Sequence, residues 1–404
     1  MSAPLIYLDN NATTAVAPEV LEAMLPYLRE QYGNPSSMYS FGGTAYKAVD
    51  KARQQVAAFL NASPEEIIFT ACGTESDSTA ILGAFEALPE KRHFITSKVE
   101  HSAVIALGQF LERKGYRVTW LDVDGKGQLD LAHLEAALSQ DTGIVSLMYA
   151  NNETGTIFPI QQAAQMAKDR GIPFHVDAVQ VAGKIPLDLA MLPVSYLALS
   201  GHKLHAPKGI GVLFLRRGAP FRPFLRGGHQ ENGRRAGTEN VASIVGLGAA
   251  CELAARHIQE ENTRVKSLRD RLEKGLLHAI PECSINGDVG NRLPNTTNIS
   301  FKYVEGEAIL LLLDQEGICA SSGSACTSGS LEPSHVLRSM NVPFTYAHGS
   351  VRLSLSRYTT ETEINKTLEV LPKVIKRLRE ISPYRSLSSD TLPGNAKACA
   401  CKEF

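Results

Sequence analysis

Short apolar runs alternate with longer amphipathic segments between residues 66 and 215. Each run is four to six residues long and is followed by polar or small residues, as buried strands are. The runs predict strands over residues 66–70, 93–96, 116–121, 144–149, 173–177, 196–200 and 211–215. The segments between them carry apolar residues at helical spacing and predict helices over 76–87, 102–114, 131–139 and 160–170.

This alternation predicts the α/β fold class, with a mostly parallel seven-stranded sheet that helices cover on both faces. Ligands of such sheets bind beyond the carboxyl ends of the strands. The residues that directly follow each strand are therefore the first candidates for chemistry.

The pattern changes after the last of these strands. Residues 240–276 form one long helical pattern with alternating charge, which links the large domain to a smaller α+β domain with strands over 297–301 and 350–355 and helices over 305–315 and 361–381. Residues after 382 are rich in Ser, Pro, Gly and Lys, which is typical of a mobile tail. We expect four parts: an N-terminal arm of the small domain (1–15), a large domain (16–255), a small domain (256–382) and the tail (383–404).

Composition narrows the class of protein. The chain has 404 residues, of which 44% are hydrophobic and 21% charged, as in an ordinary soluble protein. A formal net charge of −1 favours neither nucleic acid nor a membrane surface. We find no apolar run near the roughly 18 residues of a membrane span and no signal peptide, so we expect a cytoplasmic protein. Its seven cysteines show no framework spacing and should be thiols there.

Polar clusters follow three of the predicted strands. Gly73-Thr74 enters a helix and offers backbone N–H groups and a hydroxyl to a phosphate, although Thr74 could equally be an ordinary N-cap. His101 follows the next strand, where a lone histidine is more often a satisfied core residue. Asn152 lies in a polar cluster directly after another apolar strand.

Two charged residues end neighbouring predicted strands and together indicate a cofactor. Asp177 ends a buried strand, where an unpaired carboxylate is costly, and a protonated pyridine nitrogen would be a suitable partner. Lys203 follows the next strand in Ser200-Gly-His-Lys203, where burial could lower its pKa and suit it to Schiff-base chemistry. Considered by itself, the Lys203 motif would be explained by a structural lysine in a salt bridge. The pair is the arrangement that pyridoxal-phosphate enzymes use.

One cysteine lies in an unusual setting. Residues 321–330 are mostly Ser and Gly around Cys326, a composition that cannot pack a core and predicts a mobile loop. Free cysteines are usually buried and inert, which is the expectation for Cys72, Cys251, Cys283 and Cys319. Cys326 is therefore the candidate for thiol chemistry.

At this point the sequence resembles the fold-type I pyridoxal-phosphate enzymes, and within them the cysteine desulfurases of the NifS/IscS group. The resemblance extends from Tyr7 to about Tyr384. The matching motifs are Tyr7-Leu-Asp-Asn-Asn-Ala-Thr-Thr14, Gly33-Asn-Pro-Ser-Ser37, Gly73-Thr-Glu-Ser-Asp77, Glu100-His101, Asn151-Asn-Glu-Thr-Gly155, Asp177-Ala-Val-Gln180, Ser200-Gly-His-Lys203, Arg235-Ala-Gly-Thr-Glu239, Ser321-Ser-Gly-Ser-Ala-Cys326 and Val351-Arg-Leu-Ser354.

The resemblance implies a role for each site residue. Lys203 would bind the cofactor covalently, Asp177 would keep the ring nitrogen protonated, and His101 would stack on the ring. Polar substituents of the ring and its phosphate would be held by Asn152, Gln180, Gly73, Thr74, Ser200 and His202. Thr238 would reach the phosphate of the neighbouring subunit, which implies a homodimer.

The resemblance also implies the reaction. The carboxylate of L-cysteine would pair with Arg352, with Asn34 and Asn152 nearby. Cys326 would attack the substrate sulfur as a thiolate and carry it as a persulfide, with His101 as a proton carrier and alanine as the other product. An iron–sulfur scaffold protein would receive the sulfur. No resident metal is expected, although a transient iron–sulfur cluster on Cys326 is left open.

Several alternatives stay open. An aminotransferase or selenocysteine lyase of the same fold would use Lys203 but would not require Cys326, and an inactive scaffold would require neither. Cys399 and Cys401 are an incomplete metal site, and adventitious tail thiols are the simpler interpretation. Three local sequences are closer to the nitrogen-fixation branch of the group than to the housekeeping branch: Glu75-Ser-Asp-Ser-Thr79, Lys203-Leu-His-Ala-Pro-Lys208 and Gly227-Gly-His-Gln230.

Overall fold

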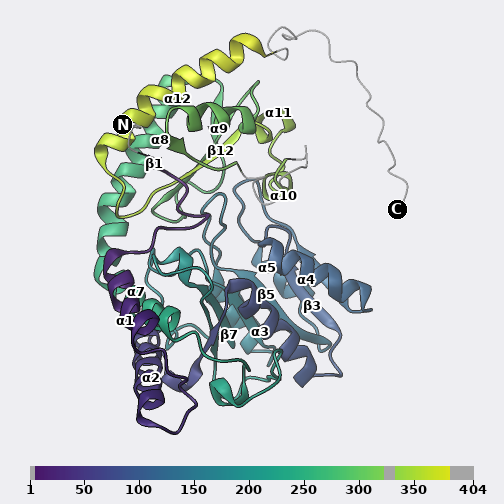
Figure 1. Ribbon diagram of the computed structural model, residues 1–404. Coiled ribbons are helices and arrows are strands. Elements are labelled where there is room, and N and C mark those ends of the chain that lie inside the picture. Colours follow the sequence, from purple (N-terminus) through teal and green to yellow (C-terminus); the bar gives the residue numbers. More distant parts are fainter. Residues whose placement is uncertain (1–4, 323–332, 383–404) are drawn as a thin grey trace.

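A computed structural model describes residues 5–322 and 333–382 of the chain (Figure 1). Cys326 and the expected mobile tail, with Cys399 and Cys401, lie outside these residues. The described chain forms a large α/β part around one sheet and a smaller part above it.

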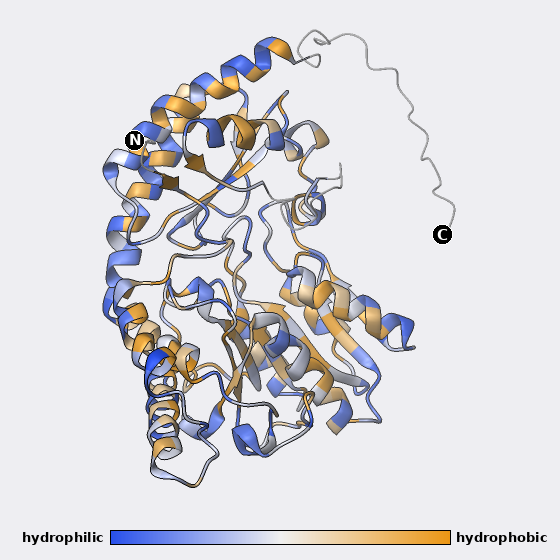
Figure 2. Cartoon of the chain, in the orientation of Figure 1, coloured by the Kyte–Doolittle hydropathy of each residue, from blue (hydrophilic) through white to orange (hydrophobic). Residues whose placement is uncertain are grey.

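The large sheet has seven strands and is mostly parallel, as predicted. The strand order, which the sequence did not predict, is β2-β8-β7-β6-β5-β3-β4, and every neighbouring pair is parallel except those made by β8. Six of its strands are buried throughout and largely orange in Figure 2, as in a sheet covered on both faces, whereas the edge strand β4 is exposed or half-buried except at Leu121. They span Ile67–Thr70 (β2), His93–Ser97 (β3), Arg117–Leu121 (β4), Thr142–Met148 (β5), Phe174–Asp177 (β6), Tyr196–Ser200 (β7) and Gly211–Leu215 (β8).

Two hydrophobic clusters cover the two faces of this sheet. One cluster contains apolar side chains of α3 and α4, and the other contains side chains of α1, α2, α5, α6 and α7. These helices span Pro18–Arg29 (α1), Ser40–Leu60 (α2), Gly73–Ala87 (α3), Ser102–Arg113 (α4), Leu131–Ala137 (α5), Ile160–Lys168 (α6) and Val241–Glu260 (α7). The sheet is therefore held between two helical layers, and its carboxyl ends point toward the smaller part.

The smaller part has a core of its own. An antiparallel sheet in the order β12-β10-β9 packs against α8, α9 and α12, and a two-stranded parallel pair, β1 with β11, joins this core. These elements span Ile6–Tyr7 (β1), Lys266–Ala279 (α8), Cys283–Ile285 (β9), Thr296–Phe301 (β10), Gly306–Gln315 (α9), Ile318–Cys319 (β11), Ser350–Ser354 (β12) and Glu361–Ile381 (α12). The exact domain limits remain a prediction.

A long helical segment connects the two cores. It comprises α7, a π-helical turn over Glu261–Val265 and α8. By length and composition Val241–Ala279 could cross a membrane, so the expectation that no stretch reaches this threshold was wrong. However, 56% of its most apolar 18-residue window is buried in the protein, as in a core helix.

Two details of the helices differ from the predictions. Helices α1 and α2 were not predicted, although Ala45, Val49, Ala52 and Val56 already repeat at helical spacing and are buried. Helix α3 begins at Gly73 rather than at residue 76, and its N-cap residue, Cys72, makes no side-chain capping bond. The alternative role of Thr74 as an N-cap is therefore wrong, because Thr74 lies inside the first turn.

Candidate active site

Asp177 is a buried carboxyl at the carboxyl end of β6. Its side chain is 7% exposed, and its Oδ1 accepts a hydrogen bond of 2.9 Å from the N–H of Val179. Burial raises the pKa of Asp177, whereas its interactions with His101, with the N–H of Val179 and with the charge of Lys203 lower it. A cationic group placed against Asp177 would thus favour its ionised form.

Two further buried acids lie behind Asp177. Burial raises the pKa of Asp77, and the charges of Asp177 and Glu100 raise it further. Burial likewise raises the pKa of Glu100, to about 8. Asp77 Oδ1 lies 3.5 Å from Nε2 of His175, whose pKa burial lowers to about 3, so we interpret this contact as one between neutral groups. Asp177 is therefore the acid of this cluster best placed to carry charge.

Lys203 lies one strand away, in the turn that follows β7. Its Nζ donates to the backbone carbonyls of Asn11 at 2.6 Å and Ala12 at 2.7 Å. The parallel pairing of β6 with β7, in which Asp177 lies opposite Ala198, brings the two strand ends together. The structure thus brings Asp177 and Lys203 to one edge of the sheet, as the sequence predicted.

The first turn of α3 lies beside these strand ends. A Cβ atom at Gly73 would lie 2.8 Å from Val179 Cγ2 and 3.6 Å from Ser200 Cβ, so only glycine permits this approach. Thr74 is exposed next to it. The Oγ of Ser200 is buried and has no hydrogen-bond partner among the described residues. An uncapped helix N-terminus beside an unsatisfied hydroxyl is suited to an anionic group such as a phosphate.

Two histidines border the same region. His101 is the N-cap of α4, and its Nδ1 accepts a 3.2 Å bond from the N–H of Ala103, which leaves the proton of a neutral ring on Nε2. His202 Nδ1 lies 3.1 Å from Thr13 Oγ1. Burial, followed by the charge of Lys203, lowers the pKa of His202 to about 4, so its ring is neutral at physiological pH.

Asn11 is a hub of the site that the sequence analysis missed. Its carbonyl accepts from Gln180 Nε2 at 3.0 Å as well as from Lys203, and its side chain donates to Thr296 Oγ1 at 2.8 Å and to the Asn152 carbonyl at 3.2 Å. The polar run Asp9-Asn10-Asn11 directly after an apolar pair was the available signal. The N-terminal arm thereby connects both cores to the site.

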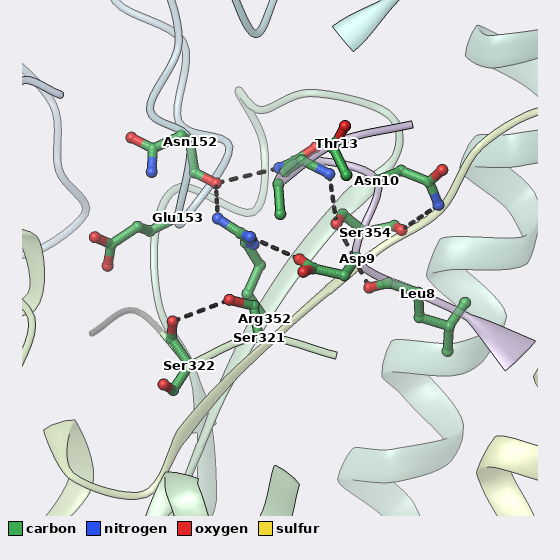
Figure 3. A network of polar contacts seen from close by, with 12 residues as sticks. Leu8, Asp9, Asn10, Thr13, Asn152, Glu153, Ser321, Ser322, Arg352 and Ser354 are labelled. Carbon is green, nitrogen blue, oxygen red and sulfur yellow. Dashed lines mark hydrogen bonds and ion pairs between the residues drawn. The ribbon is translucent and has the colours of Figure 1, made fainter. Parts of the chain in front are cut away.

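Arg352, on β12, lies at the centre of the polar network in Figure 3. Its guanidinium donates to Asp9 Oδ1 at 2.7 Å and to the Asn152 carbonyl at 3.0 Å, and its buried Nε has no hydrogen-bond partner among the described residues. The role of Asp9 was also missed by the sequence analysis. Arg352 therefore comes to the predicted region, where Asp9 already holds one edge of its guanidinium.

Both flanks of the segment that contains Cys326 are held at this network. On one side, Ser321 exchanges backbone hydrogen bonds with Arg352, of 2.7 and 3.2 Å. On the other, Ser334 Oγ donates to Glu153 Oε2 at 2.5 Å.

Two predicted site residues make no contact with the rest in the described structure. Asn34 is exposed, and its Oδ1 accepts a local 2.9 Å bond from the N–H of Ser36. Thr238 is exposed and lines a separate cavity of about 200 Å³. Its loop is anchored to the start of α3 because Arg235 Nε donates to Glu75 Oε1 at 2.8 Å. The roles given to Asn34 and Thr238 stay predictions.

The geometry defines the class of ligand. A buried carboxyl, a lysine amine, a histidine and an uncapped helix N-terminus lie at the carboxyl ends of the strands. They match an aromatic nitrogen base that carries an aldehyde and a phosphate. The aminotransferase class-V family matches residues 6–367, and the chain belongs to this family of pyridoxal-phosphate enzymes.

Named relatives narrow the assignment to one group of that family. Cysteine desulfurase 2 of Trichormus variabilis is 62% identical over 98% of this chain and 99% of its own, and cysteine desulfurase NifS of Azotobacter vinelandii is 59% identical over 94% and 95%. A solved NifS-like protein shares 39% identity, with a TM-score of 0.88 over 93% of this chain and all of that chain. Within the family, the chain belongs with the cysteine desulfurases.

Proposed function

We propose that this chain is a pyridoxal-phosphate-dependent cysteine desulfurase that converts L-cysteine to L-alanine and carries the sulfur on Cys326. The observation that supports it most is the meeting of Asp177 and Lys203 at adjacent strand ends beside an uncapped helix N-terminus. In the overall reaction the substrate C–S bond breaks and an S–S bond to Cys326 forms. The proton of the Cys326 thiol balances the product methyl group.

The cofactor would be held by residues that the structure gathers at one edge of the sheet. Its phosphate would be bound by Gly73, Thr74, Ser200 and His202, and its ring by His101, Asn152, Asp177, Gln180 and Lys203. When bound, pyridoxal phosphate supplies an electron sink for the negative charge that develops at the substrate Cα. The residues around it position the substrate and move its protons.

Lys203 and His101 would be the proton carriers. Lys203 follows the strand that pairs with the Asp177 strand, and its Nζ would take the Cα proton as a general base. The Nε2–H of His101 is the free edge of a ring whose other nitrogen is occupied by Ala103. His101 would carry the protons that leave the thiol groups and enter the product methyl group.

A product analysis of the unmodified protein tests this function. With L-cysteine and a thiol reductant, we expect alanine and sulfide in equal amounts. Without reductant, the peptide containing Cys326 should gain the mass of one sulfur atom. A keto acid in place of alanine would identify an aminotransferase, and turnover of selenocysteine alone would identify a selenocysteine lyase.

Asp177→Ala should retain some cofactor but lose most activity, because the ring nitrogen would no longer be held protonated. Asp177→Asn isolates the charge, since its amide oxygen can still accept the bond from Val179. We expect both variants to lose about 10²-fold or more in turnover. Steady-state alanine release measures this, and near-normal turnover by Asp177→Asn would remove the role given to the carboxylate.

Arg352→Ala should chiefly weaken cysteine binding, because a charged contact to the substrate carboxylate is lost. Such contacts contribute about 1.5–3 kcal/mol, or about ten- to a hundred-fold in affinity. The readout is a raised KM with a smaller change in kcat. The thermal midpoint must be followed as well, because the change also removes the partner of Asp9. An unchanged KM would point to another carboxylate partner, with Arg357 as the next candidate.

Assembly and pathway are proposals of the same kind. We propose a cytoplasmic homodimer in which Thr238 completes the phosphate site of the partner subunit, and an iron–sulfur scaffold protein as sulfur acceptor. Similarity to the NifS protein of Azotobacter vinelandii supports a role in nitrogenase maturation. Equal amounts of the chain in cells grown with and without fixed nitrogen would argue for a housekeeping role.

A further inference from the structure

A second lysine, Lys184, lies buried directly behind the site. It is 6% exposed, and its Nζ donates to the Gln180 carbonyl at 3.0 Å and to Gln180 Oε1 at 3.2 Å. Neither the proposed reaction nor the cofactor site uses this residue. Among the described residues, the hydrogen bonds that Lys184 Nζ donates go to neutral oxygens; a buried lysine in this setting is costly, and it needs an explanation.

A short chain of hydrogen bonds joins Lys184 to Lys203. Because Lys184 donates to Oε1 of Gln180, the amide group of that residue must turn its Nε2 the other way. Nε2 then donates to the Asn11 carbonyl at 3.0 Å, which also accepts from Lys203 Nζ at 2.6 Å. The Asn11 carbonyl therefore accepts directly from Lys203, and it is linked to Lys184 through Gln180 alone.

The two lysines also line one small cavity. Its volume is about 20 Å³, room for a single water molecule, and its polar lining consists mainly of Lys184, Lys203, His205, His257, Glu261 and Arg357. Glu261 begins the π-helical turn between α7 and α8, and it accepts a hydrogen bond from the backbone of Arg357. Turns of this type occur frequently at functional sites.

The charges around Lys184 work against each other. Burial and the charge of Lys203 lower the pKa of Lys184 to about 7, with Glu261 raising it and Arg352 lowering it. Burial raises the pKa of Glu261 to about 7 as well. The charge on Lys184 is therefore sensitive to pH near neutrality. The coupling is mutual: a positive charge on Lys203 disfavours one on Lys184, and a positive charge on Lys184 disfavours one on Lys203.

We propose that Lys184 is a positioning residue that orients Gln180 and controls the protonation of the Lys203 amine through the Gln180–Asn11 link. A nearby cationic group lowers the pKa of an active-site lysine, so that more of its amine is neutral and able to react. The inference rests on the proposed role of Lys203 in holding the cofactor. It assigns to a buried, otherwise unused lysine the task of keeping that amine able to accept a proton.

The test compares two substitutions in the cofactor-loaded protein. Lys184→Met removes the charge at similar length, whereas Lys184→Arg keeps it. We expect the pH midpoint of the cofactor's visible absorption to rise by about one unit in Lys184→Met and to stay near that of the parent protein in Lys184→Arg. The pH optimum of turnover should shift in the same direction.

Equal midpoints in the parent and Lys184→Met proteins would overturn the proposal, and so would equal shifts in the two variants, because charge would then be irrelevant. Should Lys184→Met not fold, the reciprocal experiment replaces it. Coupling is mutual, so the NMR midpoint of Lys184 in the cofactor-free protein should rise by about one unit in Lys203→Met. An unchanged Lys184 midpoint would refute the proposal. Borohydride fixation of the cofactor elsewhere than on Lys203 would instead refute the proposed function.

Discussion

Cys326→Ala should release neither alanine nor sulfide from cysteine, while the protein keeps the visible absorption of its bound cofactor. In the proposed mechanism, binding of the cofactor and of cysteine would use Asp177, Lys203 and Arg352, and this substitution changes none of them. Sulfur removal requires a nucleophile, and the methyl side chain of alanine offers none. The loss should be about 10³-fold or more, the scale on which removal of a covalent nucleophile acts.

Cys319→Ala is the matched control for this substitution. Cys319 lies in β11, seven residues before Cys326, and burial raises the pKa of its thiol, which makes it a poor nucleophile. We expect this control to turn over near the parent rate. Normal alanine release by Cys326→Ala would eliminate the persulfide mechanism and favour an aminotransferase or a lyase, with the cofactor site left intact.

Lys203→Ala should lose the covalent attachment of the cofactor together with about 10²- to 10⁴-fold of the activity, the range that a lost general base accounts for. In the structure the amine of Lys203 is held by two carbonyls of the N-terminal arm, so alanine removes both the attachment point and the proton acceptor. Borohydride reduction followed by peptide mass analysis measures the attachment. Turnover of cysteine measures the lost base.

Lys208→Ala is the control, because Lys208 is an exposed lysine of the same loop. It should keep both attachment and activity. Lys184 is the informative competitor, since it lines the same cavity as Lys203. Cofactor fixed to Lys184 in the parent protein would reverse the roles given to the two lysines.

The positions of the strands along the chain, and the polar residues that follow them, could be predicted from sequence. All seven predicted strands exist and belong to one sheet, because each is a short apolar run bounded by turn residues. The positions of Asp177 and Lys203 followed, since each directly succeeds such a run. Helices α1 and α2 escaped the analysis because they are amphipathic and lie outside the strand–helix alternation.

The partners of these residues could not be predicted in the same way. Periodicity reports local burial, and every signal in the sequence analysis was local. Asn11 holds Lys203 through its backbone carbonyl, which every residue possesses, so its polar side chain does not reveal this contact. Arg352 and Asp9 are 343 residues apart and meet only because β1 and β12 belong to the same core.

The sequence by itself determined the α/β class, the carboxyl edge of the sheet as the site, and the two residues on which the cofactor chemistry depends. Those properties arise from the local alternation of apolar and polar residues. Only the tertiary structure decided that the N-terminal arm contacts the site, that Asp9 holds Arg352, and that Lys184 and Lys203 line one small cavity. Such contacts depend on which distant segments fold against each other, and the energy that selects them is spread over both cores.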